Sequence, residues 1–440
     1  MKTYDQVFKV IKEKNIKYIA LRAEGFTSRS HFLWVPVLEL QTAVEKGISI
    51  DGGPLGFAKV NKSDVVLKAD LDSFMILPWD REGNSVAGVV CDLYYPDTRE
   101  EIKEYPRCIL KRAIRKLKEV IGEEVNFYVA PEPEFFFLTR IDGKLTLHDK
   151  GTYFSPPPID KGYKIREELC DVFEKMGLKV VKSHHEMPPA KHEINIQYDQ
   201  ASRMADKLYF YKLMVKKLVD EEGLIATCMP KPFDWTYGAG WHTHLSLLNE
   251  RTEANLFYSP KSEHGLSDLC LYFINGILTH AKALAAITNP TVNSYKRLVP
   301  GKEAPVYLTW SKYNRSALLR IPSSLPEGTR IEYRPTDGSC NFYLAFAALL
   351  YAGLDGIARK KTLPQVEEDL ADFTEKEKLE RGIEVLPSNL GEALKELEQD
   401  EVIKNAISPL TQKYIEAKRK EWHEYSTKVF DWERERYLDV

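Results

Sequence analysis

The 440-residue chain is 43% hydrophobic and has a formal net charge of −3, which is typical of a globular protein of two or three domains and not of a nucleic-acid or anionic-membrane binder. No apolar run approaches the ~20 residues that span a bilayer, and the amphipathic start MKTYDQVFKVIKEKN does not resemble a signal peptide. The six scattered cysteines match no zinc spacing, so we expect buried thiols and a cytoplasmic location.

The first hundred residues predict a small unit with several strands. A helix is expected over 3–14, with strands at 18–22 and near 33–40, 64–69 and 87–94. Asp51 heads a loop with three glycines and a proline, and an aspartate that starts a turn is common, so this pattern alone leaves its role open. The apolar pattern is lost over 95–106, which predicts a boundary between domains of residues 1–103 and 104–440.

The second unit opens with a helix over 107–121 and a strand over 125–138 that contains two glutamates. Because alternate residues of a strand share a face, Glu132 and Glu134 are expected roughly 6.6 Å apart on one side. Apolar residues flank them, and two like charges in such surroundings repel unless a cation lies between them. The pattern therefore favours a metal site.

A second group of ligand types is the segment HHEMPPAKHE over 184–193. Glu193 begins an alternating run, which predicts another strand with a polar face. The surrounding segments predict a loop over 147–160, a helix over 162–176, a strand over 178–182 and a long core helix over 199–222.

Residues 229–248 predict a turn followed by an alternating strand. His242, His244 and Ser246 share one face of that strand, although histidines two residues apart are often only satisfied core residues. Gly238-Ala-Gly240 lacks the third glycine of a dinucleotide loop, and the chain has no Walker lysine motif. ATP, if used, is therefore not bound by a P-loop.

The stretch 289–334 is neither a helix pattern nor a plain loop. Short apolar runs at 306–310 and 317–321 predict strands, and RIEYR over 330–334 puts two arginines and a glutamate on one face. This suits a site that holds a cation and an anion, while an ion ladder on an exposed sheet is the alternative. Helices are expected over 264–287, over 341–357 and through the last eighty residues.

Carboxylates with a single imidazole are the ligands of Mg²⁺ or Mn²⁺ rather than of zinc or copper. Hard divalent ions that face several arginines are the usual arrangement for phosphoryl transfer. The residues alone thus predict a Mg-dependent enzyme that acts on a phosphorylated compound. The candidate metal ligands are Glu132, Glu134, Glu186, Glu193, His242 and Glu332.

Several motifs in one order resemble the glutamine synthetase family, closest to its class I form. They span nearly the whole chain: PEPEFFF (131–137), HHE…HE (184–193), GAGWHTHLSL (238–247), NPTVNSYKRLVPGKEAP (289–305), NRSALLRIP (314–322), RIEYR (330–334) and LAFAALLYAGLDGI (344–357). The resemblance implies an α+β fold, with a small β-grasp-like domain before a catalytic domain whose curved antiparallel sheet forms an open barrel flanked by helices. It also implies a homo-oligomer, a dodecamer of two hexameric rings with each site at a subunit interface.

The implied reaction ligates ammonia to the γ-carboxylate of glutamate. ATP phosphorylates that carboxylate, the amine displaces phosphate, and a closing flap protects the intermediate from water. By resemblance, one metal ion would bind Glu134, Glu186 and Glu193, and a second would bind Glu132, His242 and Glu332. The nucleotide phosphates would meet Arg315, Arg320 and Arg330, with His244 and Ser246 nearby. Glutamate would be bound by Arg297, Arg334 and Gly238. Ammonium would be bound by Tyr153, Glu186 and Asp51 of a neighbouring subunit, under a flap with Glu303.

The chain departs from the family pattern near the amino acid and the amine. Tyr237 stands where the family usually has Asn beside the substrate, and the other departures are Gly53 and Pro54 for two serines, Lys191 for Gln and Val181 for Glu. A γ-glutamyl ligase for a larger amine, such as a polyamine or ethanolamine, is the alternative. A non-enzymatic paralogue is a third hypothesis.

Overall fold

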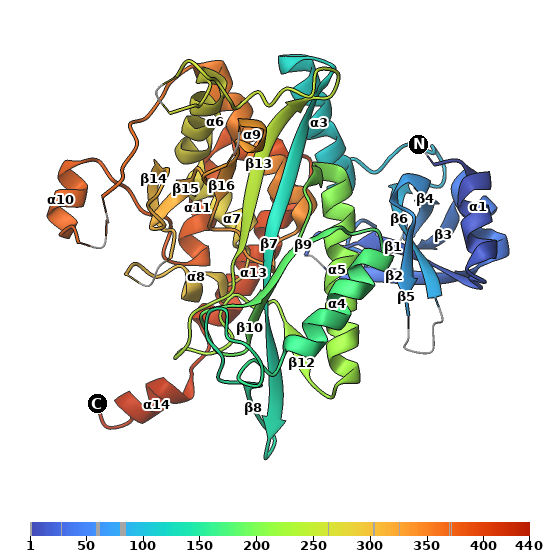
Figure 1. Cartoon of the computed structure of the whole chain (residues 1–440), viewed down its shortest axis with the longest axis horizontal. Helices are drawn as coiled ribbons and strands as arrows, with labels where there is room; N and C mark the ends of the chain where they lie inside the picture. Colours follow the sequence, from blue (N-terminus) through green and yellow to red (C-terminus); the bar gives the residue numbers. More distant parts are fainter. Residues whose placement is uncertain are drawn as a thin grey trace.

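The computed structural model describes residues 2–27, 29–58, 62–79, 85–262, 264–301, 304–324, 326–368, 370 and 372–440. Two sheets organise these residues, a six-stranded sheet near the N-terminus and a ten-stranded sheet in the rest of the chain. Helices surround the larger sheet, and the smaller sheet stands to one side of it, beyond α3 and α5 (Figure 1). This arrangement confirms the predicted α+β class.

The smaller sheet has the strand order β2-β1-β6-β4-β3, with β5 also paired to β6. Its central pair, β1 and β6, is parallel, and its other pairs are antiparallel. Two of its elements, α2 and β5, were not predicted because they have only six and four residues, which is too short for a hydrophobic periodicity to stand out. The bounds are α1 Tyr4–Glu13, β1 Tyr18–Glu24, β2 Ser30–Pro36, α2 Leu40–Glu45, β3 Ile48–Asp51, β4 Asp64–Ala69, β5 Met75–Pro78 and β6 Ser85–Tyr94.

The larger sheet is built around β7, a 17-residue strand that pairs with β8, β10, β11, β12 and β13. Its main path is β14-β15-β16-β13-β7-β10-β9. Every strand carrying a candidate metal ligand neighbours another on this path, which is why the site forms here. The bounds are β7 Val125–Ile141, β8 Lys144–Leu147, β9 Val180–His185, β10 Lys191–Ile196, β11 Asp199–Gln200, β12 Ile225–Thr227, β13 Trp241–Asn249, β14 Tyr307–Ser311, β15 Ala317–Arg320 and β16 Ile331–Tyr333.

The helices bury their apolar faces against this sheet and against one another. At the crossing of α6 and α9 the backbones touch, because a Cβ on Gly276 would lie 2.1 Å from the Ala352 carbonyl oxygen. The bounds are α3 Pro106–Ile121, α4 Tyr163–Lys175, α5 Ala201–Glu221, α6 Asp268–Thr279, α7 Ala281–Thr288, α8 Ser294–Arg297, α9 Phe342–Arg359, α10 Glu375–Glu380, α11 Leu390–Gln399, α12 Glu401–Ile407, α13 Thr411–Ser426 and α14 Asp431–Tyr437.

The single helix predicted over 264–287 was wrong, because α6 and α7 meet at an angle of 74°. His280 lies at the break, where its Nδ1 is 2.6 Å from Asp400 Oδ2 and its Nε2 is 2.9 Å from Asp355 Oδ2. These carboxylates belong to α9 and to the N-cap of α12, so a tertiary contact and not a local breaker residue accompanies the bend.

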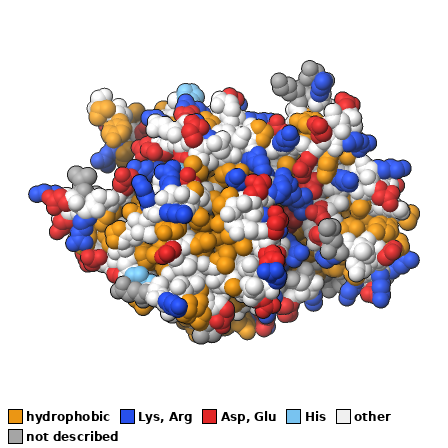
Figure 2. All heavy atoms as spheres, turned by 90° about the horizontal axis from the view of Figure 1, so that it is seen from above, with side chains coloured by type: hydrophobic (Ala, Val, Ile, Leu, Met, Phe, Trp, Pro, Cys, Tyr) orange, Lys and Arg blue, Asp and Glu red, His pale blue; other side chains and the backbone are white. Residues whose placement is uncertain are grey.

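By length and composition alone, α9 could cross a membrane, but 72% of it is buried inside the protein. It is therefore the core helix against which α3 and α6 pack. On the surface seen in Figure 2, lysine and arginine side chains are interspersed with acidic ones. This distribution agrees with the near-neutral composition.

Candidate active site

The register of the larger sheet brings the candidate ligands together from distant parts of the chain. Glu132 and Glu134 on β7 face His242 on β13 and Glu193 on β10, respectively. Glu332 on β16 pairs with His244 on one side and Arg320 on the other. A band of charged side chains therefore crosses five adjacent strands.

The first group in this band is Glu132, His242 and Glu332, whose ligand atoms all lie within 4.8 Å of one another. His242 Nδ1 is 3.3 Å from Glu132 Oε2 and 3.4 Å from Glu332 Oε1. Burial would raise the pKa of Glu132, but hydrogen bonds with His242 and His244 hold it below its usual range. Two carboxylates and one imidazole are a donor set that fits Mg²⁺ or Mn²⁺.

Glu332 is fully buried and is held between two arginines. Arg320 Nε donates to Oε2 at 2.6 Å, and Arg334 Nη1 donates to Oε1 at 2.8 Å. Burial alone would raise the pKa of Glu332, yet Arg334 and His242 lower it to about 2. The carboxylate is therefore ionised at neutral pH.

The second group contains Glu186 and Glu193 with His184, again with ligand atoms within 4.8 Å. Glu134, which the family resemblance puts in this group, accepts instead from Lys191 Nζ at 2.8 Å and from the Gly240 N–H at 2.6 Å. The carboxylates that the family resemblance gives to one metal ion are thus close together, but the Lys191 ammonium lies among them.

Two cavities open on either side of the carboxylates, and Glu132 and Lys182 line both. One, of about 620 Å³, lies among β7, β9, β10 and β13 and includes His244, Ser246 and Arg330. The other, of about 380 Å³, is lined by the carboxylates and by Tyr153, Tyr237, Gly238, Arg297, Arg315, Arg320 and Arg334. The largely apolar first cavity suits a flat heterocycle, and the charged second one suits a small anion-bearing molecule.

Arg297 is fixed by the backbone around it. Its Nη1 donates to the Pro335 carbonyl at 2.6 Å, and its Nη2 donates to the Arg334 carbonyl at 3.0 Å. Burial lowers the pKa of Arg297. A Cβ at Gly240 would lie 2.4 Å from Arg297 Nη2, and one at Gly238 would lie 2.4 Å from the Pro230 carbonyl oxygen. The two glycines therefore make room for the guanidinium and the turn beside it.

On the other side of the cluster, Arg330 Nε donates to His244 Nδ1 at 3.2 Å. His244 Nε2 then carries the proton and lies 3.1 Å from Glu132 Oε1. Arg330 is thus tied to a carboxylate of the first group. Burial lowers the pKa of the Arg330 guanidinium.

Two known protein families match the chain that carries this arrangement. The glutamine synthetase catalytic-domain family matches residues 103–437, and the glutamine synthetase β-grasp family matches residues 15–96. The chain belongs to the glutamine synthetase family. The resemblance drawn from the motifs is therefore confirmed.

Individual relatives agree with the family match over the full chain. It is 43% identical to the glutamine synthetase of Thermotoga maritima, covering 99% of both chains. It is 42% identical to that of Methanocaldococcus jannaschii, covering 99% of this chain and 98% of the relative. Among solved structures it is similar to a GmaS/ADP complex (TM-score 0.89, 28% identity) and to Plasmodium falciparum glutamine synthetase (TM-score 0.87, 25% identity), each at 99% coverage of both chains.

Within this glutamine synthetase family member, four predicted residues lie apart from the buried cluster. Tyr153 and Tyr237 stand at the rim of the smaller cavity, 50% and 46% exposed, and Arg315 is also exposed there. Asp51 ends β3 in the N-terminal sheet and is not among the described residues lining either cavity of its own chain. Glu303 lies outside the described residues.

Sequence reasoning missed Lys182, and it noted the segment with His184 and Lys191 without giving either side chain a place among the candidate site residues. Lys182 Nζ lies 3.2 Å from Glu193 Oε1, and His184 Nε2 lies 3.4 Å from the same atom. Strand alternation contained the signal, since residues 182 and 184 are two apart, as are 191 and 193. Both pairs therefore share a strand face.

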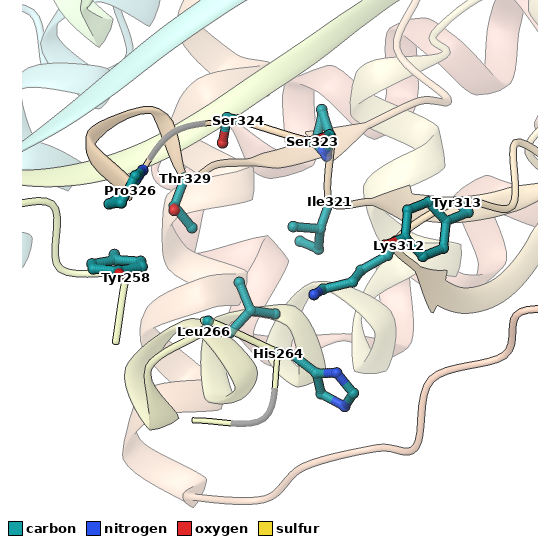
Figure 3. Close-up of a pocket in the computed structure, with 12 residues that line it drawn as sticks. Tyr258, His264, Leu266, Lys312, Tyr313, Ile321, Ser323, Ser324, Pro326 and Thr329 are labelled. Carbon is teal, nitrogen blue, oxygen red and sulfur yellow. The ribbon is translucent and has the colours of Figure 1, made fainter. Parts of the chain in front are cut away.

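A smaller cavity of about 180 Å³ lies away from the carboxylates, and Figure 3 shows Lys312 pointing toward it from the strand side. Tyr258, Leu266 and Ile321 form part of its wall. The twelve described residues that line it include no aspartate or glutamate. It therefore lacks the paired charges that mark the site.

Proposed function

We propose that this chain forms glutamine from glutamate and ammonia with the hydrolysis of ATP to ADP and phosphate. The observation that carries the proposal is the carboxylate cluster between two cavities that share Glu132 and Lys182. A nucleotide in one cavity and an amino acid in the other would bring a phosphate and a carboxylate together there. The similar solved structure of a GmaS/ADP complex supports nucleotide binding.

The residues divide by the part of the reaction they serve. His244, Ser246 and Arg330 bind the nucleotide from the larger cavity, and Arg315 and Arg320 face its phosphates. Arg297, Arg334 and the Gly238 backbone bind the carboxylate and amino end of glutamate, beside Tyr237. Divalent ions, Mg²⁺ or Mn²⁺, would be held by the Glu132, His242 and Glu332 group and would neutralise charge on the transferred phosphoryl group.

In the first step a γ-carboxylate oxygen of glutamate forms a bond to the terminal phosphorus of ATP, and the bond from that phosphorus to ADP breaks. In the second, ammonia attacks the acyl carbon and the carbon–oxygen bond to phosphate breaks. Asp51 of a neighbouring subunit takes the proton from ammonium, in a pocket with Tyr153 and Glu186. Glu303 closes over the intermediate and excludes water.

The same reasoning extends to assembly and location. We propose domains of residues 1–103 and 104–440, a dodecamer of two hexameric rings and a cytoplasmic enzyme. Asp51 supports the shared site, because it lies in the N-terminal sheet and lines neither cavity of its own chain among the described residues. A neighbouring subunit would supply Asp51 across a subunit interface.

The test is ATP-dependent phosphate release with glutamate fixed and the amine varied over ammonium, methylamine, ethanolamine and a polyamine. We expect ammonium to give the highest kcat/KM and mass spectrometry to identify glutamine. The larger-amine alternative is not favoured, since the curated relatives at about 40% identity are glutamine synthetases. A strong preference for a larger amine would reverse this assignment, and no release with any amine would support the non-enzymatic hypothesis.

A further inference from the structure

Lys191 places a positive charge inside the carboxylate cluster. Its Nζ donates to Glu134 Oε2 at 2.8 Å and to the Gly238 carbonyl at 3.2 Å, and it lies 3.9 Å from Glu186 Oε2. Lys191 is only 6% exposed, so this position is a defined one inside the protein. Glu134 and the Gly238 carbonyl accept two of the three donors of the ammonium, and Glu186 lies within ion-pair distance.

The position of Nζ relative to the expected ligands is the decisive point. It contacts Glu134 and approaches Glu186, which are two of the three carboxylates that the family resemblance gives to one metal ion. A cation that bonds to one carboxylate of the set and lies close to a second occupies part of the space that an ion held by all three would need. A divalent ion there would have to displace the ammonium or remain against it at close range, where like charges repel.

The group of Glu132, His242 and Glu332 differs from the Glu134 group in the position of its cations. The arginines that contact Glu332, Arg320 and Arg334, each bond to that carboxylate and form no described ion pair with Glu132. A carboxylate oxygen has two lone pairs, so an arginine on the outer side leaves capacity for an ion on the inner side. Among the residues that the structure describes, no lysine or arginine nitrogen forms ion pairs with two of the three ligands Glu132, His242 and Glu332.

We infer that Lys191 Nζ is a built-in cation that replaces one of the two metal ions, so that the apoenzyme binds one divalent ion per site, at Glu132, His242 and Glu332. The inference rests on the proposed function only in taking these carboxylates as a metal site. It assigns Lys191 a permanent role in neutralising Glu134. It also ties that charge to the Gly238 carbonyl, next to Tyr237 in the amino-acid cavity.

The second lysine of the cluster provides a matched control. Lys182 Nζ lies 3.2 Å from Glu193 Oε1 and 3.7 Å from Glu132 Oε1, but its side chain is 49% exposed. Its ammonium can turn toward solvent, whereas that of Lys191 is enclosed by the protein. Replacing Lys182 therefore should not create a new ion site.

The experiment counts Mn²⁺ bound to the full-length oligomer without nucleotide or amino acid, by electron paramagnetic resonance of free Mn²⁺ and by calorimetry. We expect one ion per chain in the wild type and in Lys182→Gln, two in Lys191→Gln, and none in Glu332→Gln. The second ion of Lys191→Gln should bind at least ~100-fold more tightly than any second ion of the wild type. Two ions or none in the wild type, or a second ion in Lys182→Gln, would overturn the inference.

If Lys191→Gln does not fold, Glu134→Gln in the otherwise unchanged chain decides the matter. Because Lys191 and not an ion pairs with Glu134, this variant should still bind one Mn²⁺ with less than a threefold change in affinity. Loss of an ion would overturn the inference. The counts use no substrate, so they stand whether or not the amine assay confirms glutamine formation.

Discussion

Two clusters of buried charge in this molecule are built on opposite principles. At the junction with the N-terminal sheet, one guanidinium, that of Arg107, contacts Asp70, Asp92 and Asp206 at 2.7, 2.7 and 2.8 Å. In the larger sheet, Glu132 and Glu332 come together with His242, and Arg320 and Arg334 each bond to Glu332. The first cluster, around Arg107, is neutralised within the chain, and we call it the closed cluster. The second, of Glu132, His242 and Glu332, leaves ligand atoms facing one another beside two cavities, and we call it the open cluster. Whether a counter-charge is built in separates a structural cluster from a binding one.

Glu332→Ala should have the largest effect, because it removes a proposed metal ligand and leaves two buried arginines unpaired. We expect kcat for phosphate release to fall about 10³–10⁴-fold, since charge neutralisation by a metal ion is worth several kcal/mol. Circular dichroism and size-exclusion chromatography of the same sample check the fold. Glu332→Gln, which keeps the shape, is the matched control. Near-normal turnover in either variant would contradict the assignment of Glu332.

A mixture of Asp51→Ala and Glu332→Ala chains should recover activity if the open cluster is completed by a neighbouring subunit. Random mixing in a ring would give a fully intact site at about a quarter of the interfaces. The assay is phosphate release after dissociation and reassembly of the two variants, with native mass spectrometry to confirm hybrids. Hybrids that recover no activity would indicate that each site is formed within one chain.

Arg107→Ala tests the closed cluster. Removing the shared guanidinium takes the ion pair from Asp70 and from Asp206 and leaves Asp92 with Lys111 alone, so the free energy of unfolding should fall by about 3–5 kcal/mol. Urea denaturation followed by fluorescence measures this loss. The turnover per folded chain at low temperature should remain within about twofold of the wild type, because the residues of this cluster line neither cavity of the candidate active site. Lys111→Ala, which removes the partly exposed ion pair with Asp92 at 2.6 Å, should cost less than about 1 kcal/mol.

His280 forms a third charged contact, and the charge of its ring depends on pH. Both ring nitrogens face carboxylates, so both must donate and the ring is an imidazolium. Burial would lower the pKa of His280, but Asp400 and Asp355 raise it above its usual value. A raised pKa stabilises the fold below the unfolded value near 6.5 and loses that contribution as pH rises through the folded value.

His280→Gln should therefore lose about 1–2 kcal/mol of unfolding free energy at pH 6 relative to the wild type. The difference should be smaller at pH 9, because the wild-type ring loses its charge as pH rises through its raised pKa. Urea midpoints of both proteins at the two pH values provide the measurement. An equal difference at both values would show that the contact is not ionic.

Tyr237→Asn should have the smallest effect, because Tyr237 is half exposed at the rim of the open cluster. Its ring adds bulk beside the proposed glutamate site, while Arg297 and Arg334 remain as carboxylate anchors. We expect KM for glutamate to fall by about threefold to tenfold with kcat nearly unchanged, which is the signature of improved uniform binding. Steady-state kinetics with Tyr237→Phe as control would test this. Loss of activity with glutamate would make Tyr237 a specific substrate contact.

Much of the site could be predicted because strand alternation is a local rule. It grouped Glu132 with Glu134, and Arg330 with Glu332 and Arg334, from spacing alone. The pairing between strands could not be predicted, since it depends on register between distant segments. Sequence reasoning therefore did not show that Lys191 reaches Glu134. The break at His280 was missed for the same reason, because no glycine or proline marks it and its partners lie on α9 and α12.

The central position of β7 has a consequence for how the protein folds. Its neighbours come from far along the chain, as the hydrogen bond between Gly240 and Glu134 shows, whose donor and acceptor are 106 positions apart. Contacts of such separation form slowly, because the entropy of closing a long loop is lost before the pairing repays it. The ligand set therefore does not exist in a partly folded chain, and a divalent ion cannot nucleate the sheet. Such an ion acts after the sheet has closed, so it lengthens the lifetime of the native state and leaves the folding rate unchanged.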